Sequence, residues 1–377
     1  MSILNFIFFS IASDFKSFHR KREIEAVIKV GDVKAVYYKP PESFLKGLRR
    51  IFSFRKDEQE FDNLKILNLY VLIPMTWALK SKALMYLFVE LPIKLQVSYA
   101  RHNYLNTKDV ISWFYKPNQY LYLKNLKPYI YLHYDNYKDD ISYKFSSSAQ
   151  FDKILIDCIS NSLFTLISSS KLYEAYKTIK SNGIYYYPNA ISRELIPSDV
   201  DKLNKQNENK VIGFIGQLDN SFDVELVKKI SKAFKGYSIR LIGGYSEVVF
   251  EALDGCENIE LLGYMKYELL GEEIKNFSIG ICPYKDNSFN KFRNPLKITE
   301  YYSYGLPVVS VNCDIDDKAK EFMGIANTHD EFIKSIKAQL TENTLSKNIH
   351  RRKYAEKNCW DNRISFLMNK ISDNKTQ

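Results

Sequence analysis

Cysteine and histidine are both scarce in this sequence, with five of each among 377 residues. The cysteines stand far apart, and no two of them form the C-x-x-C spacing that is typical of redox or zinc sites. The histidines form no ligand-spaced cluster, so the sequence gives no support to a structural metal. We therefore expect reduced, packed cysteines in a cytosolic protein that needs no metal and no resident cofactor.

Long hydrophobic runs are missing as well. The apolar stretch 3–12 has no basic residues before it and meets Asp14 at once, so it is predicted to be a buried parallel strand rather than a signal peptide. The longest later run, 69–79, contains a proline and is shorter than the ~18 residues that a membrane span needs. Residues 77–89 are predicted to form a buried helix; the alternative is an interfacial helix whose lysines reach the solvent.

A glycine-rich dinucleotide fingerprint is absent. Residues 213–219 read GFIGQLD, which lacks the G-x-G-x-x-G spacing, and no acidic residue follows at the offset that a ribose contact requires. Zinc-finger spacing and an RNA-recognition signature are missing too. These absences disfavour an NAD-dependent enzyme and a nucleic-acid-binding module.

Acidic residues are few where basic residues gather. The formal net charge is +10, and residues 16–56 hold twelve Lys or Arg against four Asp or Glu. Such a stretch is either the solvated face of a helix or a surface that meets anionic lipid or lipid-linked phosphate. In the second case each basic residue near the membrane contributes ~1 kcal/mol.

Short apolar runs alternate with helical patterns along the chain, which predicts parallel sheets covered on both faces. Strands are expected at 3–9, 33–38, 65–73, 110–113, 129–132 and 163–168, and then at 211–215, 239–242, 259–262, 279–282 and 308–311. The polar stretch 198–210 is the best candidate for a linker. The predicted fold is α/β, with two Rossmann-like, doubly wound domains at 1–197 and 211–349. Ligands are expected at the carboxyl ends of strands, in a cleft between the facing domains.

The most informative segment is residues 281–310, ICPYKDNSFNKFRNPLKITEYYSYGLPVVS. It begins as a buried strand and continues as a polar loop. Asn294 is then predicted to be the N-cap of a helix and Pro295 its first residue. Gly305 is predicted to end that helix, with a proline soon after it.

Two cations lie at the start of this predicted helix. Lys297 is in the first turn, where the helix dipole is already positive, and Arg293 adds to the same end. A docked diphosphate would relieve this conflict. Glu300 shares the face of Lys297 and could accept hydrogen bonds from the two hydroxyls of a ribose. The pattern therefore indicates a nucleotide site; the alternative is a capped surface helix with an ordinary Lys–Glu pair.

The same segment resembles the donor-binding signature of GT-B glycosyltransferases, especially bacterial enzymes that build capsule, exopolysaccharide or lipopolysaccharide. VIGFIGQL at 211–218, RLIG at 240–243 and NIELLGY at 258–264 resemble the earlier strands and turns of that domain. The resemblance also implies that the final helix, about 350–377, crosses back onto the first domain. It implies a nucleotide-sugar site formed by Gly216, Gln217, Gly243, Tyr264, Tyr284, Arg293, Asn294, Leu296, Lys297 and Glu300.

The N-terminal half resembles the acceptor-binding domain of the same family. SIASDFKSFHR at 10–20 resembles the loop after its first strand, and YLHYDNYKDD at 131–140 resembles its Tyr-Asp-x-x-Asp-Asp turn. Carboxylates on these loops are candidates for the base that deprotonates an acceptor hydroxyl. They are Asp139, Asp140, Asp14 and Asp135, with His133 as a further candidate. Each acid also fits a turn former or a helix N-cap.

The resemblance implies a metal-independent glycosyltransferase that moves a sugar from a nucleotide-sugar donor to a saccharide on polyprenol diphosphate. Its expected place is the inner face of the cytoplasmic membrane. Many retaining members carry a Glu eight positions before the residue that matches Glu300, and here that residue is Phe292. Inversion and retention therefore both stay open. A sugar-nucleotide epimerase and a nucleotide-sugar-binding partner without activity are alternatives with the same fold.

Overall fold

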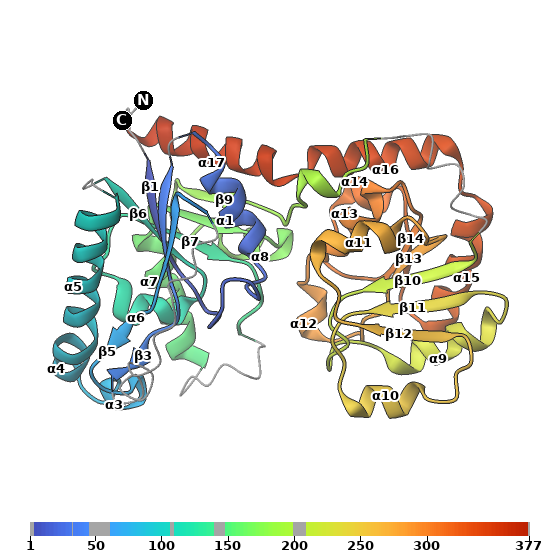
Figure 1. The fold of residues 1–377 in the computed structure, drawn as a ribbon, viewed down its shortest axis with the longest axis horizontal. Helices are drawn as coiled ribbons and strands as arrows, with labels where there is room; N and C mark the ends of the chain where they lie inside the picture. Colours follow the sequence, from blue (N-terminus) through green and yellow to red (C-terminus); the bar gives the residue numbers. More distant parts are fainter. Residues whose placement is uncertain are drawn as a thin grey trace. The chain divides into compact units, whose positions relative to one another are not determined.

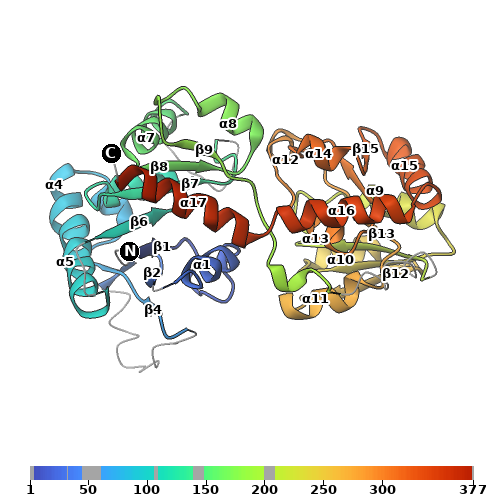
Figure 2. The same cartoon turned by 90° about the horizontal axis from the view of Figure 1, so that it is seen from above.

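The computed structural model describes residues 4–31, 33–44, 61–105, 109–138, 148–198 and 209–375. The chain divides into two compact units, each a parallel sheet with helices packed on it (Figures 1 and 2). The first unit consists of Met1–Ser168 and Leu172–Tyr187, and the second of Ser169–Lys171 and Pro188–Gln377.

The first unit is built on a seven-stranded sheet with the order β4-β2-β1-β6-β7-β8-β9. All neighbouring strands in it are parallel. The strands are β1 (Asn5–Phe9), β2 (Lys34–Tyr38), β4 (Leu64–Leu67), β6 (Val110–Phe114), β7 (Tyr129–His133), β8 (Phe164–Ile167) and β9 (Ile184–Tyr186). The central strand, NFIFF, is buried along its whole length, as a strand covered on both faces must be. A separate short pair joins β3 (Glu42–Ser43) to β5 (Tyr70–Val71).

Helices cover both faces of this sheet. Helix α1 lies on one face, and α5 and α7 lie on the other (Figure 1). The helices of this part of the chain are α1 (Lys21–Ile28), α3 (Met75–Ala78), α4 (Lys82–Met85), η1 (Tyr86–Glu90), α5 (Leu91–Ala100), η2 (Arg101–Leu105), η3 (Pro117–Gln119), α6 (Tyr120–Leu123), α7 (Ser148–Asn161) and α8 (Ser170–Tyr176).

The second unit has a six-stranded sheet with the order β12-β11-β10-β13-β14-β15. Its strands are β10 (Val211–Ile215), β11 (Ser238–Ile242), β12 (Ile259–Gly263), β13 (Ile279–Cys282), β14 (Val308–Val311) and β15 (Gly324–Ala326). All of its neighbours are parallel, so the carboxyl ends of these strands meet at one edge of the sheet.

Helices again cover both faces, with α9, α10 and α15 on one face and α11, α13 and α16 on the other (Figure 1). The helices of this unit are η4 (Arg193–Leu195), α9 (Val224–Ala233), α10 (Glu247–Leu253), α11 (Tyr267–Ile274), α12 (Ser288–Lys291), α13 (Leu296–Ser303), α14 (Asp317–Lys320), α15 (His329–Thr341), α16 (Leu345–Lys357) and α17 (Trp360–Lys375).

Helix α13 ends as the sequence predicts. Gly305 has φ +72°, its N–H donates to the Tyr302 carbonyl at 2.9 Å, and the Leu306 N–H donates to the Tyr301 carbonyl at 3.2 Å. This Schellman pattern places one residue in the left-handed region, which glycine adopts without strain. The helix thereby turns directly into β14.

The α/β prediction with two Rossmann-like domains is confirmed, and the predicted strands other than 65–73 agree with the observed ones to within two residues. The run 65–73 forms two short strands instead, β4 in the large sheet and β5 paired with β3, and the strands β3, β9 and β15 were not predicted. Residues 77–89 differ from the prediction of one buried helix. α3 ends at Ala78, a new helix begins at Lys82, and only Ala78, Met85 and Val89 of this stretch are buried. Apolar content predicted burial, but the outer side chains of these helices meet solvent. Among the described residues, no helix combines the length and the apolar composition needed to cross a bilayer.

Most of the predicted linker falls on residues 199–208, which lie outside the described residues. The domain boundaries at 197 and 211, and the placement of the final helix on the first domain, stay predictions.

Candidate functional site

The start of α13 brings the predicted cations to the carboxyl edge of the second sheet. The helix begins at Leu296 with Pro295 as its N-cap residue, and no side chain caps it. The prediction that Asn294 is the N-cap is wrong, because its side-chain amide donates instead to the Asp314 carbonyl at 3.1 Å. The Asp314 N–H in turn donates to the Arg293 carbonyl at 3.1 Å. These two bonds fix the loop that leads into the helix.

The Lys297 ammonium lies against two aromatic rings. Its Nζ is 4.2 Å from the ring centroid of Phe214 in β10 and 4.7 Å from that of Tyr284, just after β13. The guanidinium carbon of Arg293 is 4.7 Å from the same Tyr284 ring. Negative ring faces hold cations in such positions. Tyr284 therefore holds both cations at the same edge of the sheet.

Burial is the main influence on the charge of Lys297. Burial, with a smaller contribution from Arg293, lowers the pKa of the ammonium to about 8, although Glu300 and Asp219 act in the opposite direction. The side chain is therefore mostly protonated at neutral pH. An anion bound beside it would raise the pKa and favour the charged form.

Glu300 lies one turn further along α13 and is 6% exposed. Burial raises the pKa of its carboxyl to about 7, and the positive charge of Lys297 offsets part of this rise. Neither residue points into bulk solvent, so the interpretation as an ordinary surface Lys–Glu pair does not fit the structure. The two side chains form no ion pair, but each lies near enough to shift the pKa of the other.

The turn after β10 leaves room for Lys297 because residue 216 is glycine. A Cβ on Gly216 would collide with the Lys297 Nζ, and the residue has φ +145°, which L-residues rarely adopt. Its N–H donates to the Ile242 carbonyl at 2.8 Å, so it has no hydrogen left for a phosphate oxygen. Gly216 contributes to the site by having no side chain, which leaves space for the Lys297 ammonium.

The turn after β11, at Gly243 and Gly244, packs directly on the turn after β10. A Cβ on Gly243 would strike the backbone of Gly216, and the Leu218 N–H donates to the Gly244 carbonyl at 2.9 Å. The Gln217 side chain lies over Gly244, where an added Cβ would be 2.7 Å from its Nε2. Two glycine turns thus form one compact layer beside the cation pair.

Helix α13 and strand β10 are also joined directly. The N–H of Ile215, the last residue of β10, donates to the Tyr301 hydroxyl at 2.9 Å. Tyr301 is fully buried and lies on the same helix as Lys297. This bond fixes the end of the strand against the helix.

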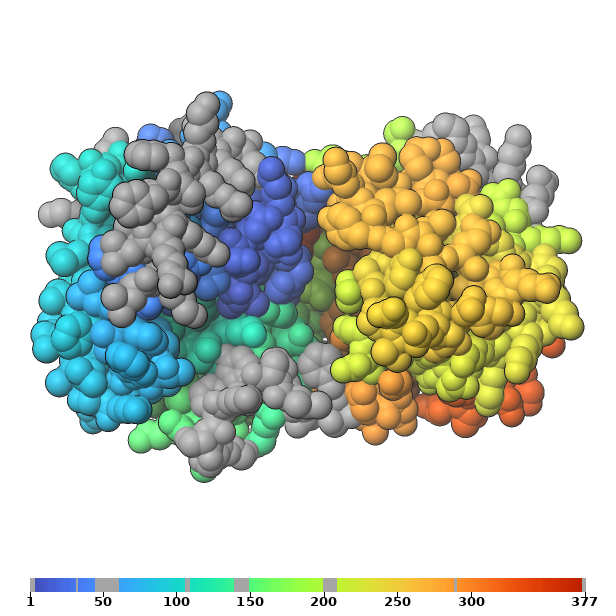
Figure 3. Space-filling view, turned by 60° about the horizontal axis from the view of Figure 1, so that its bottom comes forward, coloured from blue at the N-terminus to red at the C-terminus, as the bar shows by residue number. Residues whose placement is uncertain are grey.

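The remaining predicted donor residues differ in exposure. Leu296 is half-buried against the core, whereas Tyr264 after β12 is 79% exposed. The segment that includes β12 is coloured yellow to orange on the surface of the second unit in Figure 3. Tyr264 follows β12 and faces solvent, so it does not contribute to the packed part of the site.

The predicted acids of the first unit are placed only in part. The Lys16 N–H donates to a carboxylate oxygen of Asp14 at 3.2 Å, and the Tyr137 N–H donates to the Asp135 backbone carbonyl at 3.0 Å. Both residues thus shape turns after their strands. Asp139 and Asp140 lie outside the described residues.

His133 is not placed to act as a base. It is 1% exposed, its Nδ1 shares a hydrogen bond of 2.6 Å with the Tyr131 hydroxyl, and its ring packs against Tyr137 and Tyr176. Burial lowers the pKa of this imidazole to about 3. It is a neutral core residue in the ground state.

Sequence reasoning missed Phe214 and Asp219, which act on Lys297 from the β10 side. A signal existed in the motif GFIGQLD, where both residues flank Gly216, but its spacing does not show which helix it faces. Within the described residues, no cluster of three His, Cys, Asp or Glu side chains could hold a metal ion. The expectation of a metal-free site stays a prediction.

Comparison with known proteins relates the second unit to a family of enzymes. Residues 209–342 match the family model described as glycosyl transferases group 1. A curated relative is 26% identical over 117 residues, the "putative teichuronic acid biosynthesis glycosyltransferase TuaH" of Bacillus subtilis (strain 168). That alignment covers 30% of this chain and 30% of the relative.

Solved structures match the whole chain. Anabaena Alr3699/HepE in complex with UDP and glucose has a TM-score of 0.66 at 10% identity, covering 97% of this chain and 99% of that one. Sucrose-phosphate synthase from Thermosynechococcus elongatus has a TM-score of 0.68 at 13% identity, covering 99% of each chain. The fold is therefore the two-domain α/β fold called GT-B. The likeness to group 1 glycosyl transferases extends over residues 209–342 of the second unit.

Proposed function

We propose that this protein transfers a sugar from a nucleotide-sugar donor to a saccharide acceptor, in the synthesis of a bacterial surface polysaccharide. The observation that carries the proposal is the position of Lys297. Its cation lies in the first turn of α13, between Phe214 and Tyr284 and against a glycine turn. No carboxylate lies within salt-bridge distance of it among the described residues, so the charge is available to an anionic ligand.

Sugar transfer leaves a nucleoside diphosphate on which negative charge develops. Lys297 and Arg293 can stabilise that charge in a partly buried site, where a fixed cation acts more strongly than it would in water. The opening N–H groups of α13 point in the same direction, because the first amides of a helix have no partners within the helix. These groups together supply the stabilisation without a divalent metal.

Glu300 is the proposed acceptor for the two ribose hydroxyls of the donor. Hydrogen bonds donated to a carboxylate favour its charged form, so donor binding would lower the raised pKa of Glu300. The nucleobase would lie beyond it, near the exposed Tyr264. Gln217, Gly243, Asn294 and Leu296 complete the proposed site as residues that shape the surrounding turns.

The acceptor hydroxyl needs a base if the reaction inverts the sugar. Asp139 and Asp140 are proposed first, on the family resemblance, followed by Asp14 and Asp135. One carboxylate oxygen of Asp14 already accepts the Lys16 N–H, which leaves the other oxygen for a proton. The anomer of the product will distinguish inversion from retention.

The proposed acceptor is a saccharide on polyprenol diphosphate at the inner face of the cytoplasmic membrane, reached through the basic stretch 16–56. Three lysines of the described part, Lys16, Lys29 and Lys34, are exposed. Arg20 is 4% exposed, and its guanidinium carbon lies 4.8 Å from the ring centroid of Tyr134, so it serves packing instead. The relation to a teichuronic acid glycosyltransferase supports a polysaccharide acceptor.

Thermal melting with a panel of UDP-, GDP- and dTDP-sugars identifies the donor, because a ligand that binds only the native state raises the melting temperature. Lys297→Met should weaken the affinity for that donor about tenfold to a hundredfold, since a charge-assisted hydrogen bond contributes about 1.5–3 kcal/mol. Methionine still packs against both rings. Lys318→Met, at an exposed position on α14, is the matched control.

Incubating the protein with the identified donor and a saccharide acceptor then separates three classes. Transfer of the sugar supports the proposal. Release of an isomerised nucleotide sugar would identify an epimerase, and binding without turnover would identify a non-catalytic partner. Unchanged donor affinity in both Lys297→Met and Glu300→Ala would show that the donor site is elsewhere.

A further inference from the structure

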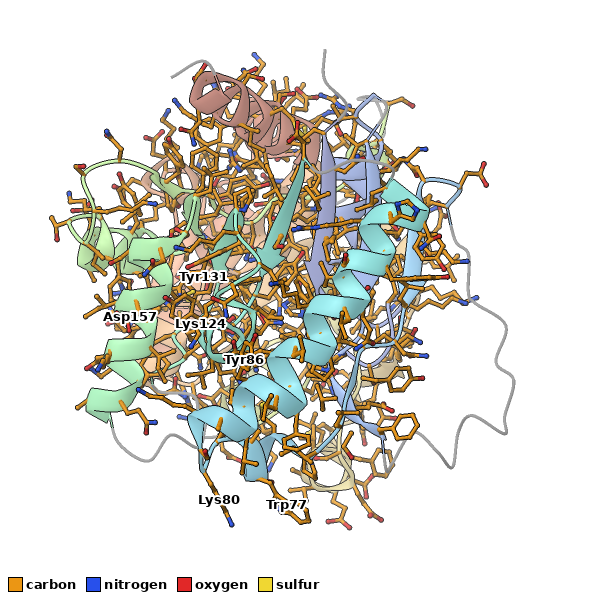
Figure 4. The ribbon with its side chains drawn as sticks, turned by 90° about the vertical axis from the view of Figure 1, so that its left-hand side faces the viewer. Trp77, Lys80, Tyr86, Lys124, Tyr131 and Asp157 are labelled. Atoms are coloured by element: carbon orange, nitrogen blue, oxygen red, sulfur yellow. The ribbon has the colours of Figure 1, made fainter. Side chains whose placement is uncertain are left out.

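The first unit exposes a group of large apolar side chains on consecutive helices. We call this group the α3–α5 surface. Its members are Leu72, Trp77, Leu79, Tyr86, Leu87, Leu95 and Tyr99, with exposed fractions from 46% for Leu72 to 63% for Leu95. Figure 4 shows the helix that includes α4 and α5 running across this side of the unit, with Trp77 and Lys80 at its lower end. Singly exposed apolar residues are ordinary, whereas a group of them on consecutive helices indicates an interaction site.

The periodicity of the helix separates this surface from the core. From α4 through α5, the inward residues Met85, Val89, Ile93 and Val97 recur every four positions and are buried. The outward positions of the same turns are occupied by Tyr86 and Leu87, by Lys94 and Leu95, and by Tyr99. The packing of the helix against the core therefore does not account for the apolar residues at the outward positions.

The charges on this segment have one sign. Residues 72–105 contain Lys80, Lys82, Lys94 and Arg101 but a single acid, Glu90. Glu90 is already occupied, since one of its carboxylate oxygens lies 3.8 Å from the Lys124 Nζ and the other accepts the side-chain amide of Asn125 at 2.7 Å. Lysines therefore flank the exposed aromatic and aliphatic side chains, and no free acid opposes them.

We propose that the α3–α5 surface is a membrane-contact surface that inserts its apolar side chains into the interface of an anionic bilayer. Tryptophan and tyrosine prefer the headgroup level, where the ring is half desolvated and its polar atom stays wet. Lysine stems extend along the apolar layer and bring their ammonium groups to anionic headgroups. A helix with this pattern lies in the plane of the interface. This inference rests on the proposed function in one respect, since a lipid-linked acceptor is met at such an interface.

The α3–α5 surface and the basic stretch 16–56 would contribute to membrane binding with different salt dependence. Basic residues alone hold a protein near an anionic membrane and release it as salt rises. Buried apolar area is much less sensitive to salt. The α3–α5 surface therefore predicts a component of vesicle binding that persists in high salt.

Trp77 provides a built-in probe for this surface. The chain has three tryptophans, and Trp77 is 56% exposed, whereas Trp113 is 0% and Trp360 is 4% exposed. Vesicles of equal parts phosphatidylglycerol and phosphatidylcholine should shift the emission of the full-length protein to shorter wavelength and protect it from acrylamide. Trp77→Phe should abolish both changes. Unchanged emission while the protein floats with the vesicles would show that another surface binds them.

Substitutions test whether the surface drives binding. Leu87→Ser with Leu95→Ser should lower the fraction that floats with these vesicles by about tenfold, because each change withdraws a large apolar side chain from the interface. Val248→Ser with Leu269→Ser is the matched control, at apolar positions of the second unit that are 72% and 53% exposed. Equal loss in both pairs would overturn the proposal. Lys82→Glu with Lys94→Glu should also reduce binding about tenfold, and most strongly at low salt.

Two further outcomes keep the proposals apart. A dimer in sedimentation that becomes a monomer in the Leu87→Ser, Leu95→Ser protein would show that a second copy of the chain covers the surface, and would overturn the membrane assignment. Vesicle binding with no affinity for any nucleotide sugar would overturn the proposed function and leave this inference standing. Donor affinity without vesicle binding at low salt would do the reverse.

Discussion

The carboxyl edges of the two parallel sheets handle charge in opposite ways. In the second unit, Lys297 and Arg293 keep their cations at the edge, held by the faces of Phe214 and Tyr284. In the first unit, ionisable groups near the corresponding region are buried in forms that avoid charge. His133 is a neutral core residue, and Glu23 of α1 is 0% exposed with its pKa raised to about 7 by burial.

This contrast shows which unit can recognise a ligand by its charge. A cation that is partly buried and held by rings is ready for an anion, because part of its desolvation has already taken place before binding. A buried neutral acid contributes to packing and offers little to a ligand. The structure therefore supports a donor site in the second unit more strongly than any one base in the first.

The largest expected effect comes from Gly216→Ala, which should break the second-unit site. The added Cβ would come too close to the Lys297 Nζ and push it aside, and the positive φ would strain the backbone. Donor affinity should fall about a hundredfold through the displaced cation, and stability by about 1–3 kcal/mol through the strain. Calorimetric titration and chemical denaturation measure the two effects. Gly236→Ala is the control, because nothing lies within 4 Å of its added Cβ.

Glu23→Gln tests whether the buried acid of the first unit is neutral in the folded protein. Burial raises the pKa of Glu23 from 4.5 to about 7, while Arg20 and the Tyr187 hydroxyl offset a part of this rise. Below pH 4.5 the carboxyl is neutral in both the folded and the unfolded protein, and folding stability has its full value. Above pH 4.5 only the unfolded state ionises readily, so stability falls as pH rises and the loss is complete above about pH 7. The loss is on the order of 3 kcal/mol.

Glutamine keeps the size of this side chain and has no charge to form. The free energy of unfolding of Glu23→Gln should therefore exceed that of the wild-type protein at alkaline pH and lose this advantage in acid. Urea denaturation across that range measures it, with the exposed Glu225→Gln as control. A variant that is less stable than the wild type at every pH would show that Glu23 is ionised in the folded protein.

A smaller effect is expected from the titration of Lys297. Burial lowers its pKa to about 8, so donor affinity should fall as pH rises above that value, by at most about tenfold per pH unit. Lys297→Arg should remove this dependence, because a guanidinium stays charged throughout the range. Titrations of donor binding across this range provide the measurement. Parallel pH profiles for the two proteins would contradict a role for the Lys297 proton.

No effect at all is expected from removing divalent metals. If Lys297, Arg293 and the start of α13 stabilise the leaving diphosphate, transfer should proceed at the same rate in excess EDTA. Initial rates with and without EDTA, and after adding back Mg²⁺ or Mn²⁺, make the comparison. A rate that depends on the metal would show that these cations do not replace it.

The sequence predicted much of the second unit, because its local signals agree with each other. Pro295 and Gly305 bracket α13 within one residue at each end, and the helical spacing of Lys297 and Glu300 puts both on one face. The rings that hold Lys297 were not predictable in this way. Phe214 is 83 positions away in sequence and meets it only because β10 and β13 are neighbours in the sheet.

Two predictions failed where tertiary contacts override local preference. Asn294 has the chemistry of an N-cap, but the Asp314 carbonyl takes its amide. Residues 77–89 have the composition of a core helix, and composition alone does not show which apolar side chains lack a neighbour. The i, i+4 spacing of Met85 and Val89 contained that information, since the residues between them have no place in the core.

The bond from the Ile215 amide to the Tyr301 hydroxyl has a mechanical meaning. It joins the end of β10, just before the turn at Gly216, to α13, the helix that carries Lys297 and Glu300. A displacement of either element therefore moves the other. Tyr301→Phe would leave that buried amide without an acceptor, at a cost of about 1–3 kcal/mol. The glycine turn after β10 and the start of α13 could then move relative to each other, and the proposed donor site would lose rigidity.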